Sequence, residues 1–204
     1  MVGMRLYVEG GGDTKLLRTA CREGFSMFLS QAGLKGHMPR IVACGGRRQA
    51  YDDYCTTLEQ GIHAAMLLVD SEDPVAVQTP WTHLLQRVGD QWPCPENATD
   101  NDCNLMVQCM ESWFLTDPNT LNAFFGQGFN SKALPHSSVN VETVTKASVY
   151  QALATATHAC KTKAPYGKGE HSFKILGRID PNKVTAGSAW AARFVTTLRT
   201  KMDC

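Results

Sequence analysis

Apolar residues in the first third of the chain fall into blocks that predict alternating strands and helices. A short apolar strand is predicted over residues 4–8, and it runs directly into the turn Glu9-Gly10-Gly11-Gly12-Asp13. Apolar positions then recur at helical spacing from residue 14 to about residue 32, where Gly33 favours a stop. The same order repeats, with a strand, a helix and a third strand predicted over residues 39–44, 47–59 and 64–69.

This βαβαβ order predicts an α/β fold whose sheet is mainly parallel and flanked by helices. The third strand is apolar without interruption, as expected of a central strand covered on both faces. Right-handed crossovers place the ends of the first and third strands on one edge of the sheet, so Glu9 and Asp70 are expected to meet. We expect a single domain over residues 1–204, with residues 1–75 forming the core that carries the acidic residues.

Residues 76–204 are expected to hold an insertion, further core elements and a helical, basic C-terminal extension. A short helix is predicted around residues 81–88, within a loop-rich stretch typical of an insertion or a lid. The apolar run over residues 103–115 fits either a buried strand leading into a helix or one helix, because periodicity alone does not separate the two. Three more helices are predicted over residues 117–125, 144–161 and 188–201.

Composition and charge limit the classes of protein to which the chain can belong. With 43% hydrophobic and 19% charged residues the chain is ordinary globular protein, and at a net charge of +1 any nucleic-acid partner would need a local basic patch. No apolar run has the length of a signal peptide or a membrane span, so we expect a cytoplasmic protein without membrane contact. The eight cysteines include no CxxC pair and are expected to be mostly buried thiols; the alternative is a zinc site using Cys94, Cys103 and Cys109.

The acidic residues at the predicted strand ends are the main candidates for chemistry. Asp70, Glu72 and Asp73 follow the third strand and Glu9 follows the first, which gives a cluster of hard oxygen donors that a divalent cation would neutralise. Mg²⁺ or Mn²⁺ fits such a cluster best, because an open strand-end cleft leaves room for water and a substrate phosphate. The alternative is that these carboxylates are solvated residues that cap the helices following them.

Further candidates lie outside this cluster. Glu111 is either an additional metal ligand or supporting acid among apolar neighbours, or a residue on the solvent face of an amphipathic helix. Arg47 and Arg48 either contact phosphates or begin an exposed helix. Lys168, between two glycines, is either a cation that assists phosphodiester cleavage or part of a solvated charge run. The basic residues around it are Lys161, Lys163, Lys174, Arg178 and Lys183, with His158 and His171. The four tryptophans are expected to pack in the core.

Two motifs resemble the signature of the TOPRIM fold, a Rossmann-like fold found in topoisomerases, primases and small nucleases. Glu9 in YVEGGGD matches its glutamate after the first strand, and Asp70-Ser71-Glu72 in LLVDSEDP stands where a DxD pair is usual, which leaves open whether Glu72 or Asp73 is the ligand. Strings along almost the whole chain resemble the bacterial domain-of-unknown-function family 4276. These strings are CGGRRQAYDDY, LLVDSEDPV, MVQCMESWFLTD, FFG and YGKGEHSFKILGRIDP. This second resemblance implies an association with ATPases in defence-like gene neighbourhoods.

We therefore expect a metal-dependent nuclease acting on DNA or RNA, with an ATPase partner in phage defence. Glu9 and Asp70 would bind Mg²⁺ or Mn²⁺ together with Glu72 or Asp73, Glu9 would also be the base for an attacking water, and Lys168 would be the electrophilic helper. The alternative is a non-catalytic adaptor that keeps the fold and binds an ATPase or nucleic acid. A nucleotide-binding enzyme using the GGGD turn is not favoured, because the chain has neither GxxxxGK[ST] nor GxGxxG.

Overall fold

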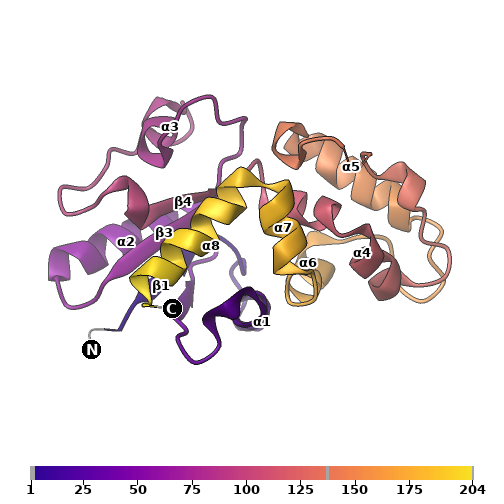
Figure 1. Ribbon diagram of the computed structural model, residues 1–204, viewed down its shortest axis with the longest axis horizontal. Helices are drawn as coiled ribbons and strands as arrows, with labels where there is room; N and C mark the ends of the chain where they lie inside the picture. The colour runs from indigo at the N-terminus through magenta and orange to yellow at the C-terminus, as the bar shows by residue number, and fades with distance from the viewer. Residues whose placement is uncertain (1–2, 137, 204) are drawn as a thin grey trace.

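The computed structural model describes residues 3–136 and 138–203 and has an entirely parallel four-stranded sheet at its centre (Figure 1). The strands are β1 (Arg5–Val8), β2 (Arg40–Ala43), β3 (Ala65–Asp70) and β4 (Cys103–Met106), in the order β2-β1-β3-β4. Helix α1 (Lys15–Leu29) connects β1 to β2, and α2 (Arg47–Gln60) connects β2 to β3. The predicted α/β fold with a parallel sheet is confirmed.

Local sequence explains where these helices begin and end. Thr14 caps α1, its hydroxyl oxygen accepting the Leu17 N–H at 3.2 Å. The chain leaves α1 through a π-helical turn, η1 (Ser30–Leu34), in which Gly33 has a φ of +91°, a value that favours glycine. Helix α2 stops where Gly61 takes the left-handed conformation.

Alternating residues of the strands face two separate layers of helices. Leu6 and Val8 belong to an apolar cluster with α1 and α8 (Ala189–Lys201), whereas Tyr7 belongs to a second cluster with α2 and α3 (Pro80–Gln86). The buried run of β3 is shared in the same way between the two clusters. The sheet is therefore covered on both faces, as its uninterrupted apolar sequence predicted.

The structure of residues 103–116 decides between the two interpretations of this apolar run, a strand followed by a helix or a single helix. These residues form β4 and then a 3₁₀ helix, η3 (Met110–Thr116), so the strand-then-helix interpretation is right and the single-helix one is wrong. Pairing of β4 with β3 carries η3 to the carboxyl edge of the sheet, where Met110 and Glu111 are buried.

The C-terminal half is helical, as expected, and shares its core with the sheet. It contains α4 (Pro118–Phe125), α5 (Lys146–Thr157), α6 (Lys168–Leu176), α7 (Pro181–Gly187) and α8. The patterns at α4, α5 and α8 predicted helices, whereas α6 and α7 were not expected. Short 3₁₀ turns occur at η2 (Asp100–Asp102), η4 (Ser131–Ala133) and η5 (Val141–Thr143). Apolar residues of α6 and α7 lie in the same cluster as Leu6 and Val8.

Helix α8 lies across the strands in Figure 1. Hydrogen bonds and an ion pair connect it to segments that are distant in the sequence. Arg193 donates to the carbonyl oxygen of Cys103 at 2.9 Å, and Lys201 pairs with Asp102 at 2.7 Å. Arg199 donates to the carbonyl oxygen of Ala32, in η1 after α1, at 2.9 Å. The last helix thus joins β4 to the end of the first helix.

The positions of the cysteines and the character of the helices test two further expectations, the zinc-site alternative and the absence of a membrane span. Cys103 and Cys109 are buried free thiols and Cys94 is exposed, and among the described residues no cysteine belongs to a group suited to hold a metal, so the zinc alternative gains no support. Cys204 lies outside the described residues. In residues 3–136 and 138–203, no helix combines the length and the apolar character needed to cross a membrane.

Candidate metal centre

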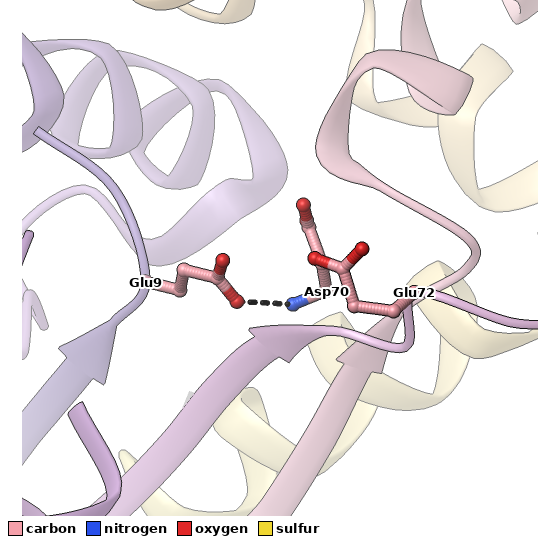
Figure 2. A group of neighbouring side chains, drawn as sticks. All are labelled: Glu9, Asp70 and Glu72. Atoms are coloured by element: carbon pink, nitrogen blue, oxygen red, sulfur yellow. Dashed lines mark hydrogen bonds between the residues drawn. The ribbon is translucent and has the colours of Figure 1, made fainter. Parts of the chain in front are cut away.

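Three carboxylates converge at the carboxyl edge of the sheet. Glu9 follows β1, Asp70 ends β3, and Glu72 lies two residues beyond (Figure 2). Each offers one oxygen, and these oxygens all lie within 4.8 Å of one another. The convergence expected from the right-handed βαβ topology is therefore observed.

Glu9 is held by the backbone of the neighbouring strand and by Arg47. Its Oε2 accepts the Asp70 N–H at 3.1 Å and lies 3.3 Å from Arg47 Nη1. Burial raises the pKa of Glu9, and the nearby Glu72 carboxylate raises it further, while Arg47 works in the opposite direction. The protonated form of Glu9 is thus favoured over a wider pH range than in an exposed glutamate.

Asp70 is the most buried member, with a side chain only 4% exposed. Its Oδ1 accepts the Met110 N–H at 2.9 Å, and its Oδ2 lies 3.3 Å from Lys146 Nζ. Burial, followed by the charges of Glu9 and Glu111, raises the pKa of Asp70 to about 8 despite the lysine. Without a further cation nearby, the protonated form of Asp70 is therefore favoured over a wider pH range than in an exposed aspartate.

Glu72 reaches the cluster through an unusual backbone conformation. Its φ is +64°, which non-glycine residues rarely adopt, and its N–H donates to the Gln108 carbonyl oxygen at 2.9 Å. The Oε1 atom lies 2.6 Å from Lys146 Nζ, at the start of α5. Strained backbone of this kind is concentrated at functional sites, which supports Glu72, rather than Asp73, as the third ligand.

Lys146 is a member of the site that sequence reasoning missed. Its ammonium bridges Asp70 and Glu72, and its backbone N–H donates to Gln108 Oε1 at 3.2 Å. Both carboxylates raise the pKa of Lys146, so it is fully charged. A divalent cation that binds Asp70 and Glu72 would have to compete with this ammonium.

Arg47 begins α2, as one alternative expected, but its side chain is not exposed to solvent. It is 13% exposed and forms a two-pronged ion pair with Asp90, at 2.8 and 2.6 Å. It also donates to the carbonyl oxygen of Asp70 and to Glu9. Arg47 therefore connects the ends of β1 and β3.

A cavity of about 360 Å³ lies beside Glu9 and Asp70. The glycine turn of residues 10–12 forms part of its wall, and Lys168, at the start of α6, lines it as well. The turn packs tightly on α1, because a Cβ at Gly11 (φ +88°) would lie 2.9 Å from the Arg18 Cα. The cavity is thus built where ligands bind in open parallel sheets, beyond the carboxyl ends of the strands.

Glu111 is buried at the same cavity. The hydroxyl groups of Tyr150 and Tyr166 donate to its two carboxylate oxygens at 3.0 and 3.1 Å. The solvent-face alternative for Glu111 is wrong, and the partners that a buried acid requires are these tyrosines. Glu111 does not join the three-carboxylate group, but its charge contributes to the raised pKa of Asp70.

Asp73 does not belong to the carboxylate cluster, and the clustered carboxylates do not cap the neighbouring helices. Asp73 pairs with Arg87 at 2.7 Å, its side chain is 60% exposed, and it is not in the three-carboxylate group. Helices α1 and α3 are capped by Thr14 and Thr79, so the clustered carboxylates are not the caps.

The basic residues noted in the C-terminal third make different contacts. Of the lysines and arginines noted in the C-terminal third, Lys168 lines the cavity, whereas Lys183 pairs with Asp117 at 2.6 Å. Lys163 and Arg178 lie over the ring of Phe124. Among the tryptophans, the core position is confirmed for three, which are Trp81, Trp92 and Trp113.

The donor set fits a hard divalent cation. Three carboxylate oxygens within 4.8 Å of one another are the ligand type that Mg²⁺ and Mn²⁺ prefer. Burial, together with the neighbouring carboxylates, raises the pKa values of Glu9 and Asp70, so a bound cation would favour the charged forms of both groups. The residues present can therefore hold such an ion, with Glu9, Asp70 and Glu72 as its ligands.

We expect stabilisation by Mn²⁺ to increase with pH. With a pKa of about 8, the Asp70 carboxyl keeps its proton in the metal-free native state from about pH 4 to about pH 8, whereas the unfolded chain loses it. The contribution of this carboxyl to stability therefore falls over that interval, while Mn²⁺, which needs the carboxylate, binds more tightly. The rise in melting temperature with Mn²⁺ relative to EDTA should be larger at about pH 8 than at about pH 6. An equal or larger rise at the lower pH would contradict this.

Comparison with known proteins identifies a family without an assigned activity. The family model described as Domain of unknown function (DUF4276) matches residues 8–199. No curated protein and no solved structure matches the chain.

Proposed function

The chain belongs to the DUF4276 family, and from the chemistry of its strand-end carboxylates we propose that it is a metal-dependent phosphodiesterase acting on DNA or RNA. The observation that carries the proposal is the group of Glu9, Asp70 and Glu72 beside a cavity that Lys168 also lines. Carboxylates that bind a divalent cation next to a free cation are suited to the charge that develops on a phosphate during cleavage.

Each residue has a separate role in this proposal. Glu9, Asp70 and Glu72 hold Mg²⁺ or Mn²⁺, which when bound polarises the phosphate and lowers the pKa of water. Glu9 also accepts a proton from the attacking water. Lys168 faces the phosphate from α6, and Glu111, fixed by its two tyrosines, adds to the negative field that attracts the cation.

The parallel sheet with a glutamate after β1 and acids after β3 supports a TOPRIM-like fold as part of the proposal. We place the enzyme in the cytoplasm, with an ATPase partner in phage defence. That setting follows from the sequence resemblance.

One observation favours a second candidate, a non-catalytic adaptor that binds an ATPase or nucleic acid. Lys146 already pairs with Asp70 and Glu72, as a permanent counter-ion would. Enzyme and adaptor differ in what Lys146 does, because in the enzyme it must give way to the metal.

The wild-type protein, alone and with its ATPase, should cleave plasmid, single-stranded DNA or RNA when Mn²⁺ or Mg²⁺ is present, and EDTA should stop the reaction. In the enzyme, Lys146→Gln should bind Mn²⁺ about tenfold more tightly in a calorimetric titration, because the competing ammonium is gone. The control is Lys161→Gln, an exposed lysine away from the cavity, which should titrate like wild type. In the adaptor, Lys146→Gln would unfold more easily, neither protein would bind Mn²⁺, and no substrate would be cleaved.

A further inference from the structure

The cavity beside the carboxylates is lined by two chemically different kinds of residue. Glu9, Asp70, Glu111 and Lys168 bring charge to the lining, whereas Leu17, Phe173 and glycines supply much of its apolar part. Inorganic phosphate would use the charged residues only and leave the apolar part empty. A nucleotide carries both kinds of group, because its phosphate is anionic and its base has flat apolar faces.

The glycines keep the apolar side open. A Cβ at Gly10 would lie 3.1 Å from Phe173 Cζ, and one at Gly12 would lie 3.4 Å from Leu17 Cδ1. A Cβ at Gly169, which comes from α6, would lie 3.8 Å from Leu17 Cδ2. Glycines of the turn after β1 and of α6 thus lie next to the same two apolar side chains, and a larger residue at these positions would crowd them.

Lys168 has its charge available for a ligand. Its ammonium lies 5.7 Å from the centre of the Tyr150 ring, and it makes no ion pair with the acids that the structure describes, in contrast to Lys146. With a metal held by Glu9, Asp70 and Glu72, Lys168 would supply a further positive charge at the cavity for an anionic phosphate.

We propose that this cavity binds one nucleotide of a single-stranded nucleic acid, with its phosphate between Lys168 and the metal site and its base against Leu17 and Phe173. At about 360 Å³ the cavity is near the lower end of ligand-site volumes, so it admits one unit and not a paired helix. A base within a duplex would have to leave its stack to enter. This inference rests on the proposed function and names its substrate class.

Gly169→Ala is the sharpest test, because it adds one methyl group at the cavity wall without straining the fold. The φ of Gly169 is not positive, the new contact with Leu17 is an ordinary one, and alanine favours the helix in which the residue lies. Gly167→Ala is the matched control, since a Cβ there meets nothing within 4 Å and Gly167 does not line the cavity. Both proteins are titrated with a nucleoside monophosphate and with inorganic phosphate, with Ca²⁺ in place of Mn²⁺ to prevent cleavage.

We expect the nucleoside monophosphate to bind wild type and Gly167→Ala more tightly than inorganic phosphate does. Gly169→Ala should lose about tenfold in nucleotide affinity and bind phosphate and metal unchanged, because the methyl overfills only the base side. With Mn²⁺, single-stranded oligonucleotides should be cleaved faster than blunt, fully paired duplexes.

The inference would be overturned if wild type bound phosphate and nucleotide with equal affinity. It would also be overturned if Gly169→Ala and Gly167→Ala lost nucleotide affinity equally. Faster cleavage of paired duplex would do the same while leaving the phosphodiesterase proposal intact. Selective nucleotide binding without cleavage of any substrate would support the cavity assignment and count against the phosphodiesterase.

Discussion

Asp70→Asn should reduce metal-dependent cleavage by at least about a hundredfold, because it removes a ligand charge at the centre of the cluster. Loss of a residue that only supports a ligand costs about 10- to 100-fold, and a ligand itself should cost more. The fold should survive, since the asparagine oxygen can still accept the Met110 N–H and the neutral amide replaces a carboxyl whose charged form is disfavoured by burial. Cleavage and Mn²⁺ affinity are measured together with the midpoint of chemical unfolding.

Asp73→Asn is the matched control, only three residues away. Asp73 is exposed, pairs with Arg87 and lies outside the three-carboxylate group, so its variant should cleave and bind Mn²⁺ like wild type. If Asp70→Asn retained the wild-type rate, or if both variants lost activity equally, Asp70 would not be a metal ligand.

Arg47→Met should lower the free energy of unfolding by about 3 kcal/mol. Breaking a buried ion pair costs about 3–5 kcal/mol because a charge is left unpaired, and the lower end applies here since Arg87 still contacts Asp90 at 3.2 Å. Arg47 also contacts Glu9 and the Asp70 carbonyl, so the variant should bind Mn²⁺ more weakly as well. Guanidinium unfolding and a Mn²⁺ titration measure the two effects.

Arg48→Met provides the comparison at the next position. The Arg48 side chain is 70% exposed, pairs with Asp52 one turn along α2 and lies 5.8 Å from the centre of the Tyr51 ring, so its loss should change stability by at most about 1 kcal/mol. Equal stability of the two variants would show that the Arg47 ion pairs do not support the strand ends.

The fold was predictable where one local signal decided the structure. Glycines, caps and apolar periodicity located β1, α1, β2, α2 and β3 to within a few residues, and the crossover rule brought Glu9 and Asp70 together from 61 positions apart. Helix α6 was missed because it begins within Gly167-Lys168-Gly169, which is typical of a turn, and has no side-chain cap. Helix α7 does carry a start signal in Asp180 and Pro181, which sequence reasoning did not use. The strand at β4 stayed ambiguous because both of its faces are buried.

The site was predictable only for residues at strand ends. Lys146 lies 76 positions from Asp70 and begins a helix whose own pattern says nothing about the sheet. Asp90, in a loop, and the tyrosines on Glu111 likewise have no local signal, because their roles arise from tertiary contacts. The need of a buried Glu111 for partners was the single clue, and it did not identify them.

The contacts of α8 with β4 and with the end of α1 affect how the protein can fold while it is being synthesised. A chain emerging from the ribosome presents β1, β3 and Glu9 early, but the apolar face that α8 covers stays open until residues 189–201 have left the exit tunnel. Lys146 and Lys168 also leave the ribosome well after Glu9 and Asp70. We therefore expect the carboxylate cluster to be assembled only after translation of α8, so an incomplete chain would be a client for chaperones rather than an active fragment.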